Sequence, residues 1–194
     1  MSSAIAIGIR LLRGKAVAIA VYGDEPEPSY AGRRELLLCD PKVPSTLRPF
    51  HAMARLPAER ALPMVKRDEM LVRDAASKSV STFIEDLRKA KASPRRAAIV
   101  SDDEPAQIGN PHLQAHADER RLLREAVASA ARDHGIESLF LIRSEVATSA
   151  GRMLGVASGA VDRWIADIAT AAGRPWRAEE KIAALAARLA LSRR

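Results

Sequence analysis

Two histidines lie four positions apart in the stretch HLQAH, residues 112–116. On a helix this spacing places His112 and His116 on one face, where their imidazoles could bind a transition metal with Asp118 or Asp103 nearby. The metalloprotease pattern would add a glutamate directly after the first histidine, but Leu113 stands there. Because such pairs are common by chance, His112 and His116 are candidates only, and we assign no metal site from them.

Other kinds of chemistry leave no motif in the chain. The sequence contains neither the G-x-S-x-G elbow of serine hydrolases nor the G-x-x-x-x-G-K-[ST] phosphate loop. A single cysteine, Cys39, excludes an internal disulfide framework and a multi-cysteine zinc site. Hydrolase, nucleotide-binding and redox functions therefore have no support from motifs, and the residues themselves call for no cofactor.

The charge balance points to a polyanionic partner. The chain has 194 residues, with 31 Lys and Arg against 24 Asp and Glu, a net charge of +7 and a pI near 10.1. Nucleic acid, DNA or RNA, is the first partner that this balance suggests. Only 4% of the residues are aromatic, so arginine contacts to the phosphate backbone are favoured over stacking on single-stranded bases. A protein partner is the alternative, in which case the basic charge serves solubility.

Length and hydropathy favour one domain over residues 1–194. The apolar runs are shorter than a membrane span, and Arg10 and Arg13 interrupt the N-terminal run without a cleavage-site pattern. We therefore expect a cytoplasmic protein that does not associate with membranes. The proline-rich segment at about 41–76 is expected to be an insertion or linker.

The apolar pattern predicts the elements that would position these residues. Residues 5–23, IAIGIRLLRGKAVAIAVYG, predict two strands around a turn, and RRELLLCD, 33–40, predicts the third strand of a meander. A helix is expected from Ser79 to about Lys91, a strand over 95–100, a long helix closed at 135 and a strand over 137–142. A small-residue stretch and two helices follow. We expect the core to contain four apolar residues of the long helix and the last strand: Leu123, Val127, Phe140 and Ile142.

This order resembles the ribonuclease H-like superfamily, and the second half is most similar to the Holliday-junction resolvases of the RuvC type. The stretches that carry the resemblance are AAIVSDDE, ADERRLLREAVASAARDHGI, ESLFLIRSEVA, TSAGRMLGVASGAVDRWIADI and AEEKIAALAARLAL. Together with the N-terminal meander they cover most of residues 4–40 and 77–191. The resemblance implies an α/β fold with a mixed five-stranded sheet, in which the antiparallel meander joins parallel βα units and helices cover both faces.

The resemblance also implies a site in which carboxylates from separate elements hold two Mg²⁺ ions. Asp102 or Asp103 matches the acid at the end of the fourth strand, and Glu180 or Glu179 matches the acid on the last helix. The first acid belongs on the opening strand, where the family reads GID and this chain reads GIR. Arg10 cannot ligate a cation. We therefore expect a degenerate site in a protein that is not an enzyme, with Mg²⁺ as a cofactor only if the site is active after all.

Three functions remain open at this point. The first is nucleic-acid binding without catalysis, through phosphate contacts from Arg10, Arg13, Lys15, Arg120, Arg121, Arg124 and Arg152. The second is a protein-interaction or scaffold module of the same fold. The third is a metal-dependent nuclease with a rearranged site of Asp102, Asp103 and Glu180. Arg10 has a further, structural role to consider, as an ion-pair partner of Asp102 or Asp103 at the carboxyl end of the first strand.

Overall fold

A mixed five-stranded sheet forms the centre of the computed structural model, which describes residues 4–23, 27–53, 56–102, 109–155 and 157–192. The strand order is β3-β2-β1-β4-β5. The antiparallel meander consists of β1 (Ile5–Leu12), β2 (Lys15–Tyr22) and β3 (Ser29–Leu37), whereas β4 (Arg96–Ser101) and β5 (Glu137–Ile142) extend it with parallel pairing. The predicted fold class is confirmed.

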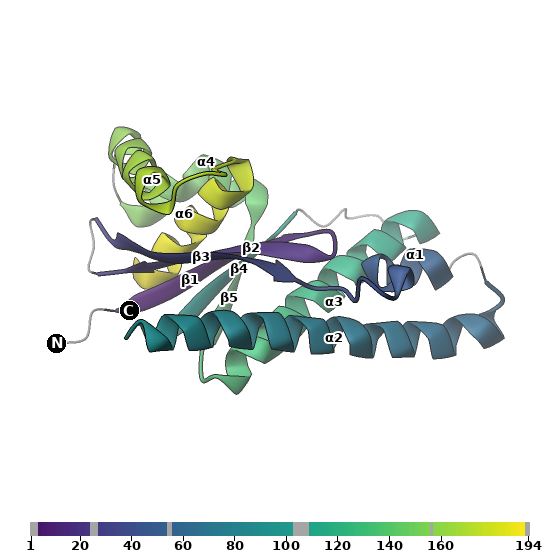
Figure 1. Cartoon of the computed structure of the whole chain (residues 1–194). Helices are drawn as coiled ribbons and strands as arrows, with labels where there is room; N and C mark the ends of the chain where they lie inside the picture. The colour runs from purple at the N-terminus through teal and green to yellow at the C-terminus, as the bar shows by residue number, and fades with distance from the viewer. Residues whose placement is uncertain (1–3, 24–26, 54–55, 103–108, 156, 193–194) are drawn as a thin grey trace.

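Helices cover both faces of this sheet (Figure 1). On one face lie α2 (Ala58–Lys89) and α3 (Pro111–Asp133), and on the other lie α4 (Arg143–Leu154), α5 (Ser158–Ala172) and α6 (Ala178–Ser192). The short η1 (Pro44–Leu47) and α1 (Pro49–Met53) pack against the outer part of α2. Both faces of β1 and β2 are buried, which explains why these strands read as nearly continuous apolar runs. Within the described ranges, no helix has both the length and the apolar character that crossing a bilayer requires.

Helix α2 begins earlier than the sequence predicted. This helix begins at Ala58 rather than after Ser79, so it includes residues 58–76 of the segment expected to be an insertion or linker. Its buried stripe continues backward from Val80 through small apolar residues, but Asp68 interrupts the pattern while being fully buried itself. Pro63 lies within the helix, and because proline usually breaks a helix, its presence argued against one here. A further helix, α4, occupies the small-residue stretch for which no helix was predicted.

The last strand is less buried than expected. Val127 is fully buried and Leu123 packs against the core, as predicted, but Phe140 and Ile142 are 52% and 39% exposed. Because β5 is the edge strand of the sheet, α3 does not cover it completely. Over Phe140 lies the guanidinium of Arg124, 5.3 Å from the ring centroid. The prediction that Phe140 and Ile142 belong to the core is therefore wrong.

Helix α6 lies directly on β1. A Cβ atom on Gly8 would come within 1.8 Å of the backbone oxygen of Ala183, so only glycine permits this approach. The alanines along the buried face of α6 keep its backbone close to the sheet. This contact brings the first turn of α6, with Glu179 and Glu180, over the carboxyl ends of β1 and β4.

Candidate functional site

Arg10 bridges two acidic side chains from distant parts of the chain. Its side chain is charged and yet only 3% exposed, because it belongs to the middle strand of a sheet that is covered on both faces. Nε donates a hydrogen bond to Oε2 of Glu179 at 2.6 Å, and Nη2 donates to Oδ1 of Asp102 at 2.5 Å. The ion pair considered for Arg10 and Asp102 is thus present, while Asp103 lies outside the described residues.

The sheet geometry explains why these groups meet. Arg10 is paired with Val100 of β4, and the two parallel strands end at the same edge, where Asp102 follows. Successive strand residues point to opposite faces. Ile9 and Leu11 pack into the core on the side of α2 and α3, so Arg10 points to the side of α6. There it meets Glu179 in the first turn of that helix.

Glu180, the candidate preferred from the sequence, has a different contact. It is buried, and its Oε2 accepts a hydrogen bond from the backbone N–H of Arg177 at 2.9 Å. The structure therefore brings Glu179 to Arg10 and uses Glu180 at the start of α6. Arg143, the first residue of α4, joins the same corner, with Nη2 3.8 Å from Oε1 of Glu179. Arg143 was not among the residues predicted from the sequence, although it directly follows β5, at the same edge of the sheet as Asp102.

The chemistry of this corner does not fit the two Mg²⁺ ions that the resemblance implies. Such ions need converging oxygen ligands. In the part of the chain that the structure describes, the corner holds Asp102 and Glu179 with the guanidinium of Arg10 between them. A guanidinium donates hydrogen bonds, cannot ligate a cation and repels one. The positive charge that lies between these two carboxylates is that of the Arg10 guanidinium.

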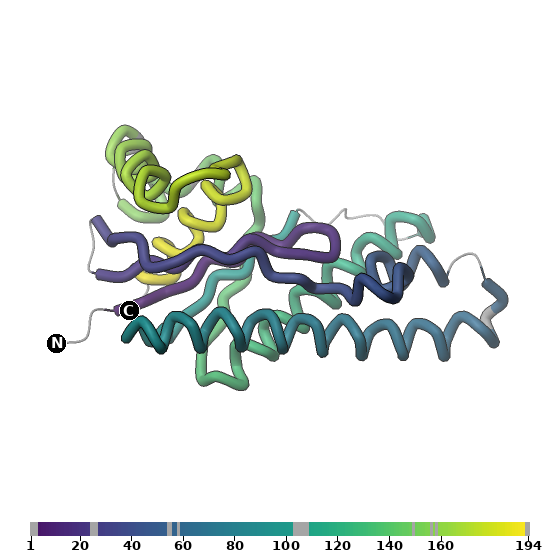
Figure 2. Tube along the Cα trace, in the orientation of Figure 1, coloured from purple at the N-terminus to yellow at the C-terminus, as the bar shows by residue number. Residues whose placement is uncertain are grey.

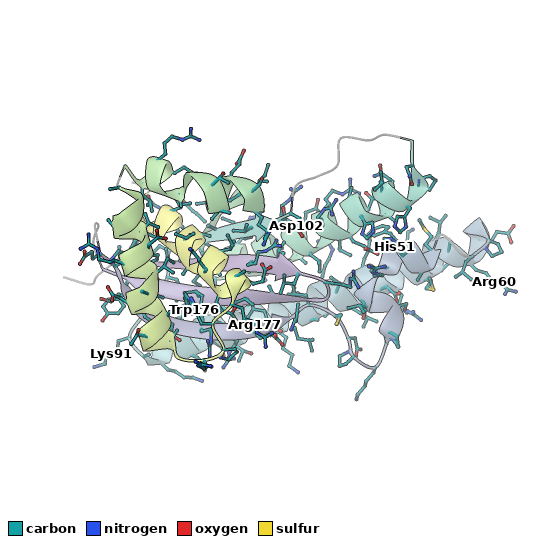
Figure 3. The ribbon with its side chains drawn as sticks, turned by 90° about the horizontal axis from the view of Figure 1, so that it is seen from above. His51, Arg60, Lys91, Asp102, Trp176 and Arg177 are labelled. Carbon is teal, nitrogen blue, oxygen red and sulfur yellow. The ribbon has the colours of Figure 1, made fainter. Side chains whose placement is uncertain are left out.

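A cleft of about 320 Å³ opens beside this corner, between the β1–β2 turn, η1 and α3. Its lining includes Arg13, Asp102, Glu119 and Arg120. Arg120 has a buried Nε and a buried Nη2 for which the described residues offer no hydrogen-bond partner. Arg13 is exposed in the turn. Asp102, labelled in Figure 3, directly follows β4 at this edge of the sheet. Unpaired guanidinium donors at a cleft suit the oxygens of a phosphate or carboxylate.

The other basic candidates lie elsewhere and have contacts of their own. Lys15 donates to Oε2 of Glu35 at 2.6 Å, and Arg121 forms an ion pair of 2.9 Å with Oδ1 of Asp118. Arg124 lies over the ring of Phe140, and Arg152 is exposed in the last turn of α4. Of the predicted set, the structure brings Arg13 and Arg120 to one cleft, with Arg10 buried behind Asp102.

The histidine pair gains a third member. His112 and His116 lie on α3 as predicted, and His51 of α1 joins them, with its ring centroid 4.3 Å from that of His116. His51 was not singled out from the sequence because α1 is short and far from α3 along the chain. Asp118 pairs with Arg121 instead of joining the histidines.

Comparison with known proteins identified structures of similar fold. No protein-family model matches the chain, and no curated protein matches it. A structure of Thermus thermophilus RuvC covers 95% of this chain and 92% of its own at 12% identity, with a TM-score of 0.56. A structure of T. thermophilus RuvC in complex with Holliday junction substrate covers 96% and 91% at 13% identity, with a TM-score of 0.55. At such identities the likeness establishes the fold, and this is the fold that the sequence predicted.

Proposed function

We propose that this chain uses a RuvC-like fold to bind nucleic acid through its phosphates, without cleaving it. The observation that carries the proposal is the pair of unpartnered, buried donors of Arg120 at the cleft beside the closed Arg10 corner. Leaving such donors unpaired is costly. Both atoms are buried in the structure, so the guanidinium would have to turn toward the cleft for a phosphate oxygen to satisfy them. Arg13 lines the same cleft and adds a second guanidinium.

Two wider properties support a nucleic-acid ligand. The chain carries a net charge of +7, which attracts a polyanion over about 10 Å, the Debye length near physiological ionic strength. The similar RuvC structure was solved with a Holliday junction substrate. A branched or duplex DNA is therefore the first ligand to test, with RNA beside it.

Arg10 is the reason that we expect no cleavage. Two-metal hydrolysis of a phosphodiester needs cations that activate water and stabilise the leaving oxygen. Arg10 lies between Asp102 and Glu179 and offsets one of their two negative charges, and Arg143 lies 3.8 Å from the other carboxylate oxygen of Glu179. In this proposal the contacts of Arg10 with Asp102 and Glu179 hold β1, β4 and α6 together, and the neighbouring cleft contacts the phosphate backbone.

Binding is tested by fluorescence anisotropy with a duplex, a four-way junction, a single-stranded DNA and an RNA, each over a series of salt concentrations. Arg120→Gln should weaken binding and reduce the slope of log K against log salt by about one unit. Arg60→Gln removes the same charge at the exposed far end of α2 and should leave affinity and slope nearly unchanged (Figure 3). Equal effects of both variants would contradict a site at the cleft.

Cleavage is tested with the same substrates in Mg²⁺ and in Mn²⁺. The wild-type protein should leave all four intact. Metal-dependent cleavage that Asp102→Asn abolishes would contradict the proposal and support an active nuclease. If the wild-type protein shows no salt-dependent binding to any of the four ligands, the nucleic-acid proposal fails, and a protein-interaction module becomes the better explanation.

A further inference from the structure

Three histidines from two helices gather beside the N-terminal half of α3. The ring centroids of His51 and His116 are 4.3 Å apart, those of His112 and His116 are 4.7 Å apart, and those of His51 and His112 are 4.8 Å apart. One ring nitrogen from each lies within 4.8 Å of the others. In Figure 3, His51 lies apart from Asp102, on the side of the molecule toward Arg60.

Local sequence features position these rings. Asn110 caps α3 by accepting hydrogen bonds from the backbone N–H groups of His112 and Leu113, and Pro111 follows at the first helical position. The two histidines of α3 are therefore held one turn apart on the same face. The short α1 packs against both α2 and α3 and presents His51 to them.

Glu119 fixes the orientation of His51. Its Oε1 lies 2.8 Å from Nδ1 of His51, and because a carboxylate only accepts, Nδ1 carries the proton. Nε2 of His51 is then left as a lone-pair donor atom. This atom is buried and has no hydrogen-bond partner within the described ranges. A histidine whose one nitrogen donates to a carboxylate while the other is free has the arrangement of a metal ligand.

We propose that His51, His112 and His116 bind a transition-metal ion of the Zn²⁺ class, with Glu119 orienting His51. Three imidazoles suit Zn²⁺ and its neighbours, whereas Mg²⁺ prefers oxygen ligands, so this site is distinct from the acidic corner. In a tetrahedral site with bonds of about 2.0–2.1 Å the nitrogens lie roughly 3.4 Å apart. The side chain of His112 is exposed, so a small rotation of this ring could bring its nitrogen closer to the other two.

The surroundings define both the charge and the place of this site. Glu119 contributes a negative charge, and Arg48 acts on His116 with a positive one. His116 and Glu119 also line the cleft that holds Arg13 and Arg120. A bound ion would tie α1 to α3 at one end of this cleft and leave a fourth coordination position for water. The proposal stands on the histidine geometry and is independent of nucleic-acid binding.

The test is a titration of the chelator-treated chain, residues 1–194, with Zn²⁺ alone, monitored by calorimetry and by competition with a chromophoric chelator. One ion per chain is expected to bind. His51→Ala and His112→Ala should each weaken binding at least tenfold, and Glu119→Gln should weaken it about 10–100-fold. The matched control is His134→Ala, which removes the fourth histidine of the chain, whose Nε2 contacts Oγ of Ser81 at 2.8 Å. This control should bind Zn²⁺ as the wild type does.

Co²⁺ in place of Zn²⁺ gives a second measurement. Four-coordinate Co²⁺ should produce visible absorption in the wild type and in His134→Ala, and this absorption should be lost in His112→Ala. The exposed position of His112 keeps the test valid even if His51→Ala does not fold. Wild-type affinity no tighter than that of His112→Ala, or loss of binding in His134→Ala alone, would overturn the proposal.

Discussion

Replacing Arg10 with alanine should cost about 2–4 kcal/mol of unfolding free energy. The substitution removes two charge-assisted hydrogen bonds, to Asp102 and to Glu179, each of which contributes about 1.5–3 kcal/mol in a buried setting. The two contributions sum to about 3–6 kcal/mol. The expected loss is reduced to about 2–4 kcal/mol because the side chains of Asp102 and Glu179 are 56% and 30% exposed, so water rehydrates both carboxylates.

The loss is measured as a shift of the urea midpoint at constant slope, and as a fall in melting temperature of about 4–16 °C. Asp102→Asn should cost less, because Arg10 then keeps its bond to Glu179. Arg13→Ala, at the exposed turn, is the matched control and should change stability by less than about 0.5 kcal/mol. Affinity for nucleic acid should be nearly the same in Arg10→Ala as in the wild type, since Arg10 is buried.

Two results would refute this reasoning. A loss below about 0.5 kcal/mol for Arg10→Ala would mean that the bridge contributes nothing beyond a surface ion pair. A larger loss for Asp102→Asn than for Arg10→Ala would mean that Asp102 has a more important partner than Arg10. In either case the corner would not be a structural tie between β1, β4 and α6.

Three further predictions concern Arg10, the contact of Gly8 with α6, and His116. Arg10→Asp places like charges together, so it should be less stable than Arg10→Ala without metal, and Mg²⁺ should raise its melting temperature while leaving that of the wild type unchanged. Gly8→Ala should cost about 3 kcal/mol or more in urea unfolding, because its Cβ would lie 1.8 Å from the oxygen of Ala183. Burial, and then the neighbouring His51, lower the pKa of His116 from 6.5, so the unfolded state binds more protons and stability should fall as pH drops below about 6.5. His116→Gln should flatten this dependence in melting curves recorded across pH, and an unchanged slope would contradict the assignment.

Local patterns in the sequence were enough to predict the five strands and their order along the chain, and the resemblance to a known family supplied the mixed sheet. The turn between β1 and β2 and the alternation of later strands with helices each follow from short-range spacing. Packing between distant elements decided the rest. Asp68 broke the apolar stripe of α2, and the exposure of Phe140 depends on β5 being an edge strand.

The candidate site was predictable where neighbouring strands bring its residues together, and unpredictable where the packing of a helix decides. Arg10 drew attention because the family that the chain resembles reads GID where this chain reads GIR. Its pairing with Asp102 follows from the parallel register of β1 and β4. The choice of Glu179 over Glu180 depends on the rotation of α6 about its axis, which the sequence does not reveal. The meeting of His51 with α3 depends on how a five-residue helix packs.

The length of α2 has a consequence for how the molecule opens. Its 32 residues span roughly 48 Å, whereas an eight-residue strand spans about 26 Å, so the helix extends well past the sheet (Figure 2). Its inner part is anchored to β3, where Ser79 Oγ donates to the backbone oxygen of Leu37 at 2.8 Å. Its outer part meets η1, α1 and α3. Amide protons of the outer turns should therefore exchange through local openings that leave the sheet intact, while those near Ser79 exchange only when the whole fold opens.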